Sequence, residues 1–117
     1  MAIKAVRLPG IVDMKDPGNG IAFQLPAHHH AICAMTSAGA ETRTLGSPQF
    51  SGQMVTLSFD VDGGNIVLTA AATVNQTGRD TLTFEDAGDE ITLRGVIKAG
   101  ALLWREVCND GVALSTV

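Results

Sequence analysis

Hydrophobic and polar residues alternate along much of this chain, which predicts β-strands rather than helices. The clearest alternation covers residues 54–61, where every second residue is apolar. Its apolar members are Val55, Leu57, Phe59 and Val61. Side chains at every second position of a strand point to the same face, so we predict that these four lie in the core. The glycine-containing sequence 62–65, followed by an apolar run at 66–69, predicts a hairpin.

Further strands are predicted by short apolar runs rich in β-branched residues. They cover residues 31–35, 81–84, 91–96, 102–108 and 112–116. Glycine-containing turns recur at intervals of roughly 8 to 12 residues, a spacing typical of β-sandwiches and barrels. We therefore predict an all-β, single-domain, antiparallel β-sandwich or barrel with a C-terminal meander. The other predicted core side chains are Leu82, Phe84, Ile91, Leu93, Trp104 and Val107.

The chain has 117 residues, which is enough for one compact core and too short to divide comfortably into two. Residues 17–117 are predicted to form the β domain, and residues 1–16 an N-terminal arm. Lys4 and Arg7 make the arm slightly basic, and a Pro-Gly pair at 9–10 interrupts any regular element. We expect the arm to lie on a neighbouring subunit and to become ordered there. A frayed terminus is the alternative.

Charged residues are few and unevenly distributed. They make up 17% of the chain, against roughly a quarter in an average soluble protein. In residues 17–59 only Glu41 and Arg43 are charged, whereas residues 60–98 carry ten charged side chains. A domain of this size has too little interior to hide an uncharged third of its chain. The stretch 17–59 is therefore a candidate contact surface. The alternative is a hydrated Ser, Thr, Gly and Ala surface that is merely uncharged.

Overall charge and hydropathy argue against two classes of partner. The net charge is -4 and the eight Lys and Arg residues are scattered, whereas binding to nucleic-acid phosphates needs clustered basic side chains. No apolar run approaches the roughly 20 residues needed to cross a bilayer. The N-terminus also lacks the pattern of a cleavable secretory signal. We therefore expect neither nucleic acid nor a membrane as a partner.

The motifs for catalysis and cofactor binding that we compared with the sequence do not match it. Residues 18–20 begin like a dinucleotide-binding fingerprint, but Phe23 occupies the third glycine position. Neither a phosphate-binding loop nor a nucleophile elbow occurs. Cys33 and Cys108 belong to no CxxC pair; we interpret them as free, buried thiols, or as a disulfide if their Cα atoms lie within about 7 Å. We predict that the protein is not an enzyme and holds no cofactor.

Three consecutive histidines, His28, His29 and His30, are the most conspicuous short feature. Imidazole is a common metal ligand, but adjacent side chains of a strand point to opposite faces, so the three do not converge on one ion. In a trimer, one histidine from each chain would encircle the axis and hold a metal or an anion, which is the alternative. We predict no metal site and interpret the histidines as exposed or contact-forming residues. The acidic groups at 60–65 and 85–90 are interpreted as turn residues rather than calcium ligands.

Trp104 is the single tryptophan in a chain with four phenylalanines and no tyrosine. We predict that it contributes a large share of one end of the core, because an indole buries more apolar surface than most other side chains. The alternative is a platform on which a sugar ring stacks.

The C-terminal third carries a combination of sequence motifs. They are TLTFEDAGD at 81–89, ITL at 91–93, WR at 104–105 with Val107, and NDGV at 109–112. Together these motifs resemble the end of small capsid decoration (cement) and head-fibre proteins of tailed bacteriophages. In those proteins a strand, an acidic glycine turn, a second strand, a Trp-bearing strand and a final glycine turn form a terminal β-meander. The resemblance covers residues 65–117 approximately.

This resemblance implies a structural role in the virion. Decoration proteins of this kind are commonly β-rich homotrimers at threefold or quasi-threefold positions, where they bridge capsid subunits after the head expands. The implied partners are the major capsid protein and further copies of this chain, with Lys4, Arg7 and the three histidines as candidate contacts. The implied location is the outer surface of the capsid, after assembly in the host cytoplasm. The alternative function is a carbohydrate- or receptor-binding module of a phage fibre or tail, with Trp104 and the acidic turns at its ligand site.

Overall fold

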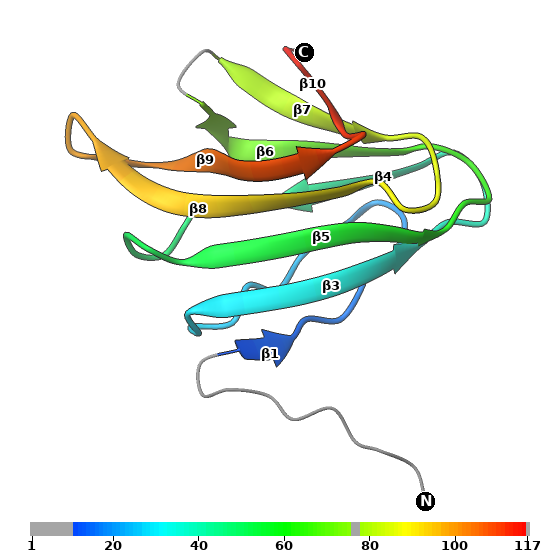
Figure 1. Cartoon of the computed structure of the whole chain (residues 1–117), viewed down its shortest axis with the longest axis horizontal. Helices are drawn as coiled ribbons and strands as arrows, with labels where there is room; N and C mark the ends of the chain where they lie inside the picture. Colours follow the sequence, from blue (N-terminus) through cyan, green and yellow to red (C-terminus); the bar gives the residue numbers. More distant parts are fainter. Residues whose placement is uncertain (1–10, 76–77, 117) are drawn as a thin grey trace, which may run out of the picture.

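Ten β-strands are present in residues 11–75 and 78–116, the part of the chain that the computed structural model describes. They are β1 (Ile11–Asp13), β2 (Ile21–Ala22), β3 (His30–Thr36), β4 (Glu41–Leu45), β5 (Met54–Val61), β6 (Ile66–Val74), β7 (Arg79–Phe84), β8 (Glu90–Lys98), β9 (Ala101–Asp110) and β10 (Ala113–Ser115). All ten belong to one curled mixed sheet, which forms a half-barrel (Figure 1). The prediction of an all-β single domain is confirmed. The prediction of a purely antiparallel fold is wrong, because five strand pairs are parallel.

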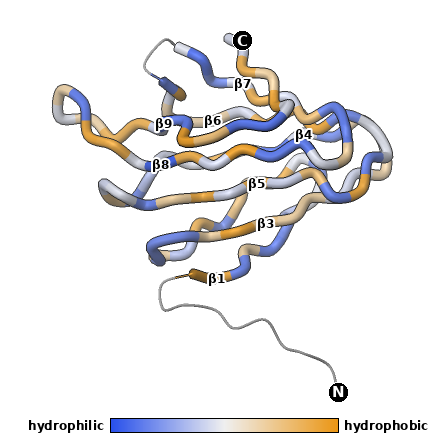
Figure 2. Tube along the Cα trace, viewed as in Figure 1, coloured by the Kyte–Doolittle hydropathy of each residue, from blue (hydrophilic) through white to orange (hydrophobic). Residues whose placement is uncertain are grey.

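The sheet curls into two halves, which we call the first and the second wing. The first wing contains β1, β3, β5, β8 and β9, and the second contains β2, β4, β6, β7 and β10. Among the described residues the wings are joined by one parallel contact, Val74 of β6 opposite Trp104 of β9. Hydrophobic and hydrophilic positions succeed one another along the strands (Figure 2), and the buried hydrophobic side chains of both wings form one cluster. The core therefore lies between the wings.

The first six strands alternate between the wings, so this part of the chain winds as a coil. Each of β3, β4, β5 and β6 pairs in parallel with the strand two before it. Residues 62–65 consequently cross from β5 to β6 on the other wing, and the hairpin predicted there is wrong. A Cβ at Gly63 or Gly64 would overlap the backbone of the equivalent crossing at 37–40. Glycine is required at this point because the two crossings pack directly against each other.

Apart from the parallel contact between β6 and β9, the last four strands form antiparallel pairs, but they do not form a continuous meander. β8 and β9 are a hairpin in the first wing, and β7 forms an antiparallel pair with β6 in the second. The C-terminal strand β10 returns to β7 rather than to β9. The predicted C-terminal meander is therefore wrong as an arrangement of neighbouring strands, although its strands are present near the predicted positions.

Eight of the ten predicted core side chains are buried, each at most 1% exposed. They are Val55, Leu57, Phe59, Leu82, Phe84, Ile91, Leu93 and Trp104. Val61 and Val107 are 51% and 47% exposed, so their prediction is wrong. Both lie at β-bulges: the β3–β5 register skips Asp60, and the β8–β9 register skips Val107 itself. A bulge inserts one residue into a strand and so breaks the alternation on which both predictions rested.

Residues 11–16, predicted as part of the arm, belong to the sheet and its core. β1 pairs with β3, and the Met14 side chain is 7% exposed. Asp16 forms an ion pair with Arg43 of β4. The domain therefore includes the chain from Ile11 onward. Lys4 and Arg7 lie outside the described residues.

Candidate interaction surface

Among the described residues, the outward positions in the central parts of the second wing's strands carry no charged side chain, and the exposed Arg79 lies at the margin where β7 begins. Buried residues alternate there with outward ones, and neighbouring strands place the outward residues side by side. We call this surface the threonine face. Its exposed and half-buried members are Ala22, Thr42, Thr44, Val67, Thr69, Ala71, Thr73, Thr83, Ala113 and Ser115, and Thr81 lies in the same rows but is only 7% exposed. One row across the wing runs Ala22, Thr44, Thr69, Thr81, Ser115, from β2 to β10.

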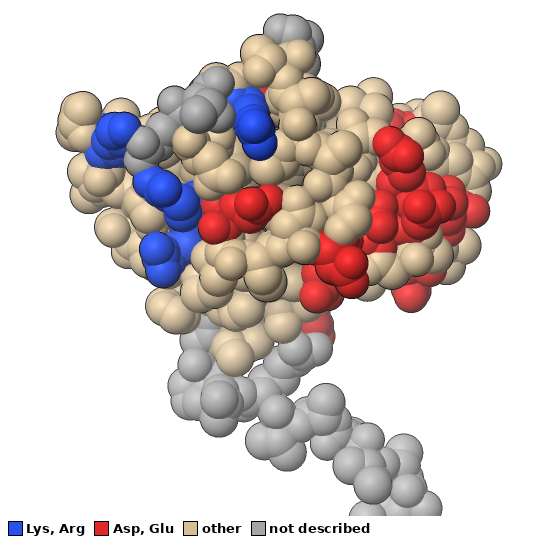
Figure 3. Space-filling model, turned by 45° about the horizontal axis from the view of Figure 1, so that its top comes forward, with Lys and Arg blue, Asp and Glu red and all other residues tan. Residues whose placement is uncertain are grey.

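The threonine face only partly coincides with the uncharged stretch predicted as a contact surface. Strands β2 and β4 come from residues 17–59, whereas β6 and β7 come from the charge-rich residues 60–98 and β10 from residues 113–115. The charged side chains of residues 60–98 lie mainly in turns and on β8. On the face that Figure 3 shows, basic and acidic side chains gather mostly at opposite ends. Sequence position alone therefore located part of the uncharged surface and missed the rest.

Arg43, one of the two charged residues in 17–59, is 2% exposed and faces the interior. Its Nε donates a hydrogen bond to Asp16 Oδ1 (2.7 Å), and its Nη2 donates to Asp16 Oδ2 (3.1 Å) and to the Thr36 carbonyl oxygen (3.0 Å). Its Nη1 lies 3.1 Å from Glu41 Oε1, an ion-pair contact without hydrogen-bond geometry. The only two charged side chains of the stretch 17–59 are thus paired with each other in a network that includes Asp16.

The network favours the charged forms of Asp16 and Arg43. Burial on its own would raise the pKa of Asp16, but hydrogen bonds from Arg43 and from the backbone N–H groups of Thr36 and Gly18 outweigh it, so the pKa is lowered. Burial on its own would lower the pKa of Arg43, and the carboxylates of Asp16 and Glu41 raise it instead. The network ties the segment after β1 to β4 and keeps charge away from the threonine face.

The three predicted contact histidines lie at and before the start of β3. His28 and His29 are exposed, whereas His30 is half-buried and its Nε2 lies 2.7 Å from Thr56 Oγ1. Thr56 Oγ1 in turn lies 2.9 Å from Thr92 Oγ1, so a polar row crosses β3, β5 and β8 on the first wing. Burial, with a smaller effect of His29, lowers the pKa of His30. The histidines therefore lie on the other wing from the threonine face.

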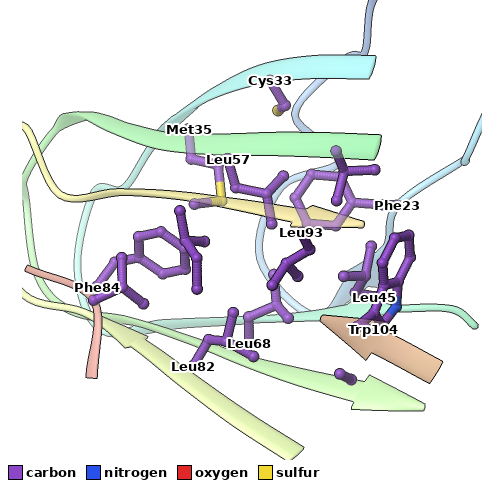
Figure 4. Packing of buried hydrophobic residues seen from close by; sticks show 14 of the residues in the cluster. Phe23, Cys33, Met35, Leu45, Leu57, Leu68, Leu82, Phe84, Leu93 and Trp104 are labelled. Atoms are coloured by element: carbon purple, nitrogen blue, oxygen red, sulfur yellow. The ribbon is translucent and has the colours of Figure 1, made fainter. Parts of the chain in front are cut away.

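Trp104 is completely buried and packs in the core near Leu45 (Figure 4). Its indole Nε1 donates a hydrogen bond to the Gly46 carbonyl oxygen (2.9 Å). The prediction that Trp104 belongs to the core is confirmed. The alternative, a sugar-stacking platform, is wrong because the ring has no exposed face.

The acidic turn between β7 and β8 is ordered by its own carboxylate. Asp89 is 8% exposed, and its Oδ2 accepts hydrogen bonds from the backbone N–H groups of Glu85 (3.0 Å) and Asp86 (3.1 Å). This agrees with the interpretation of the acidic residues as turn residues. No group of three or more His, Cys, Asp or Glu suited to a metal ion occurs among the described residues.

The two cysteines differ in accessibility. Both thiols are free, Cys33 is buried, and Cys108 is exposed on β9, so the prediction of two buried thiols is wrong for Cys108. Burial, with the Asp16 carboxylate nearby, raises the pKa of Cys33 to about 12. The Cys33 thiolate, the reactive form, is therefore scarce at neutral pH.

We expect a maleimide to label one thiol per native chain at neutral pH and both thiols in denaturant, as read from the intact mass. The matched variant Cys108→Ser should take up no label until it is denatured. Labelling of both thiols in the native wild-type protein, with the fold intact by circular dichroism, would contradict this placement of Cys33.

In the described ranges the structure has neither an enclosed pocket nor a helix long and apolar enough to span a membrane. The candidate site is therefore a surface. Comparison with protein-family models and with curated proteins found no match for this chain.

Proposed function

We propose that this protein is a structural component of a tailed-phage virion, a decoration protein that stabilises the expanded head by bridging capsid subunits. The observation that carries the proposal is the threonine face, an uncharged sheet surface that spans the second wing from β2 to β10. The resemblance of residues 65–117 to phage decoration proteins is the reason for proposing a virion as the assembly. The major capsid protein is the proposed partner, on the outer surface of the capsid, with the protein itself as a homotrimer.

An uncharged hydroxyl-rich face suits repeated burial against a shell. Burying an unpaired charge costs far more free energy than burying threonine, valine or alanine, and threonine hydroxyls adapt their hydrogen bonds to the opposing surface. A protein that binds only the expanded lattice stabilises that lattice by mass action. Because each head offers many copies of the site, modest contacts sum to a large resistance against internal pressure.

The alternative function, a carbohydrate- or receptor-binding module of a phage fibre or tail, placed Trp104 and the acidic turns at its ligand site. With the indole buried in the core, that route to sugar binding is absent. We therefore retain only the decoration role.

Capsid binding tests the proposed function through one exposed position. Thr69→Arg places a charge at the centre of the threonine face, and Ala34→Arg places the same charge on the exposed side of β3 in the first wing. We expect wild type and Ala34→Arg to co-sediment with expanded heads built from the major capsid protein of the same source. Thr69→Arg should bind at least about tenfold more weakly, because its guanidinium would be buried without a partner.

The same heads provide a second readout. Heads carrying the wild-type protein should rupture at a higher temperature than bare heads, and Thr69→Arg should restore the lower value. Equal rupture temperatures with and without bound protein would contradict the cement role. Equal binding by Thr69→Arg and Ala34→Arg would contradict the assignment of the threonine face.

A further inference from the structure

The arrangement of strands separates charge along the molecule. β8 begins at Glu90 and ends at Lys98, and β9 returns from Ala101 to Asp110. β5 runs in the opposite direction to β8 and ends beside Glu90, so that the acidic sequence following Ser58 reaches the same end. We call this the acidic end. Its exposed carboxylates are Asp60, Asp62, Glu85, Asp86, Glu90 and Asp110.

Two arginines lie next to each other toward the other end of the same wing. Arg94 of β8 is directly opposite Arg105 of β9 in the antiparallel register. Within residues 11–75 and 78–116 neither of them forms an ion pair. Like charges in directly opposed positions destabilise a sheet, and paired guanidinium groups are well suited to binding carboxylates. This pair is therefore suited to binding the carboxylates of a partner.

Exposed apolar side chains accompany both charged regions. Ile97 is 62% exposed, and Phe50 is 37% exposed with its carbonyl oxygen against Gly95, the residue after Arg94. We call Arg94, Arg105, Ile97 and Phe50 the arginine end. At the acidic end, Val61 is 51% exposed between Asp60 and Asp62. Each end thus combines one sign of charge with at least one exposed apolar side chain.

We propose that the arginine end of one copy binds the acidic end of a second copy, in a head-to-tail contact. The two ends complement each other in charge, and each supplies apolar surface for the other to cover. Because the contact joins two different patches, every bound copy offers a free patch to the next copy. A closed ring forms when the rotations between successive copies add up to a full turn. The inference rests on the homo-oligomer of the proposed function and specifies its interface. The threonine face remains free for the capsid, because none of its residues belongs to the arginine end or to the acidic end.

Single-cysteine variants test the direction of the contact. In a Cys108→Ser background, Ile97→Cys and Val61→Cys mark the two ends, and the buried Cys33 stays unreactive. We expect a short bis-maleimide to give cross-linked dimers when the two variants are mixed, and none with either variant alone. Ala34→Cys mixed with Ile97→Cys is the matched control at an exposed position outside both ends, and should give none.

Charge reversal tests the chemistry of the contact. Arg94→Glu with Arg105→Glu should weaken self-association at least about tenfold in analytical ultracentrifugation, because close charge pairs contribute strongly to interfaces. Mixing this variant with Asp60→Lys/Asp62→Lys should restore association. Lys15→Glu, which reverses an exposed charge outside the arginine end, should associate like wild type. Rising salt should weaken the wild-type assembly because it screens exposed charges.

Three results would overturn the head-to-tail contact. They are unchanged self-association of the double arginine variant, cross-linking of Ile97→Cys with itself alone, and a wild-type protein that stays monomeric both alone and on heads. None of these three results decides whether the protein binds the capsid. The Thr69→Arg experiment measures capsid binding for each chain, whether or not the chains associate. Loss of capsid binding with the head-to-tail assembly intact would instead contradict only the proposed function.

Discussion

Replacing Arg43 with alanine should lower the free energy of unfolding by about 3–5 kcal/mol, because the substitution leaves buried or half-buried carboxylates without their partner. The Arg43 side chain is 0% exposed, and those of Asp16 and Glu41 are 20% and 14% exposed. Chemical denaturation monitored by circular dichroism measures the change. Thr42→Ala, at the exposed neighbouring position of the same strand, should stay within about 0.5 kcal/mol of wild type.

Arg43→Lys separates charge from geometry at the same position. Lysine keeps the positive charge but lacks the planar fork that bonds both Asp16 oxygens, so we expect a smaller, still clear loss of stability than with alanine. Stability of Arg43→Ala equal to that of Thr42→Ala would show that the network does not hold the segment after β1 against β4.

The same network makes the free energy of unfolding depend on pH under acidic conditions. The pKa of Asp16 is lowered in the folded protein, so the folded chain binds fewer protons than the unfolded chain as the pH falls below about 4. The stability contributed by this carboxylate is therefore present above that range and is lost on further acidification. Asp16→Asn should be less stable at neutral pH and show a shallower loss of stability in acid.

Trp104→Ala should cost about 3–5 kcal/mol, because it removes a fully buried indole and leaves a cavity beside Leu45. The loss also leaves the Gly46 carbonyl oxygen without its Nε1 donor. Chemical denaturation followed by far-ultraviolet circular dichroism measures the loss. Trp104→Phe fills most of the volume and should lose less.

Val107 provides the matched control for Trp104 on the same strand. Because Val107 lies at the β9 bulge and is 47% exposed, Val107→Ala should change stability by no more than about 0.5 kcal/mol. A large loss for Val107→Ala, or a negligible loss for Trp104→Ala, would contradict the described core.

Local pattern predicted seven of the ten described strands and missed β1, β2 and β4. Alternation reports which faces of a strand are buried, whatever its neighbours are. The strands 54–61 and 91–96 correspond to β5 and β8, and their inward residues Leu57 and Leu93 are in the core. Alternation carries no information about the partner strand. The turn 62–65 has the composition of a hairpin turn, yet it crosses between the wings.

A signal for the parallel coil was nevertheless present in the sequence. Residues 37–41 and 62–66 are both short glycine-containing turns leading into a strand, and Glu41 is paired with Ile66, 25 positions later. The other parallel pairs of the coil are 19, 22 and 24 positions apart, so the signal is two similar turns rather than a fixed repeat. Bulges left no comparable signal, which is why Val61 and Val107 were placed in the core.

From the sequence alone, the threonine face could be recognised only from the polar residues that alternate with buried ones along the strands. Thr42 with Thr44, and Thr81 with Thr83, occupy alternate positions of β4 and β7. Their meeting on one surface depends on β6, which separates these two strands in space. The arginine pair depends likewise on the β8–β9 register, which a bulge shifts by one residue.

A reconstruction of expanded heads incubated with this protein tests the central claim most directly. The account predicts density for the domain on the outer surface of the capsid, with β4, β6 and β7 facing the shell. Heads without added density, or density in which the first wing faces the shell and the threonine face is turned to solvent, would contradict it.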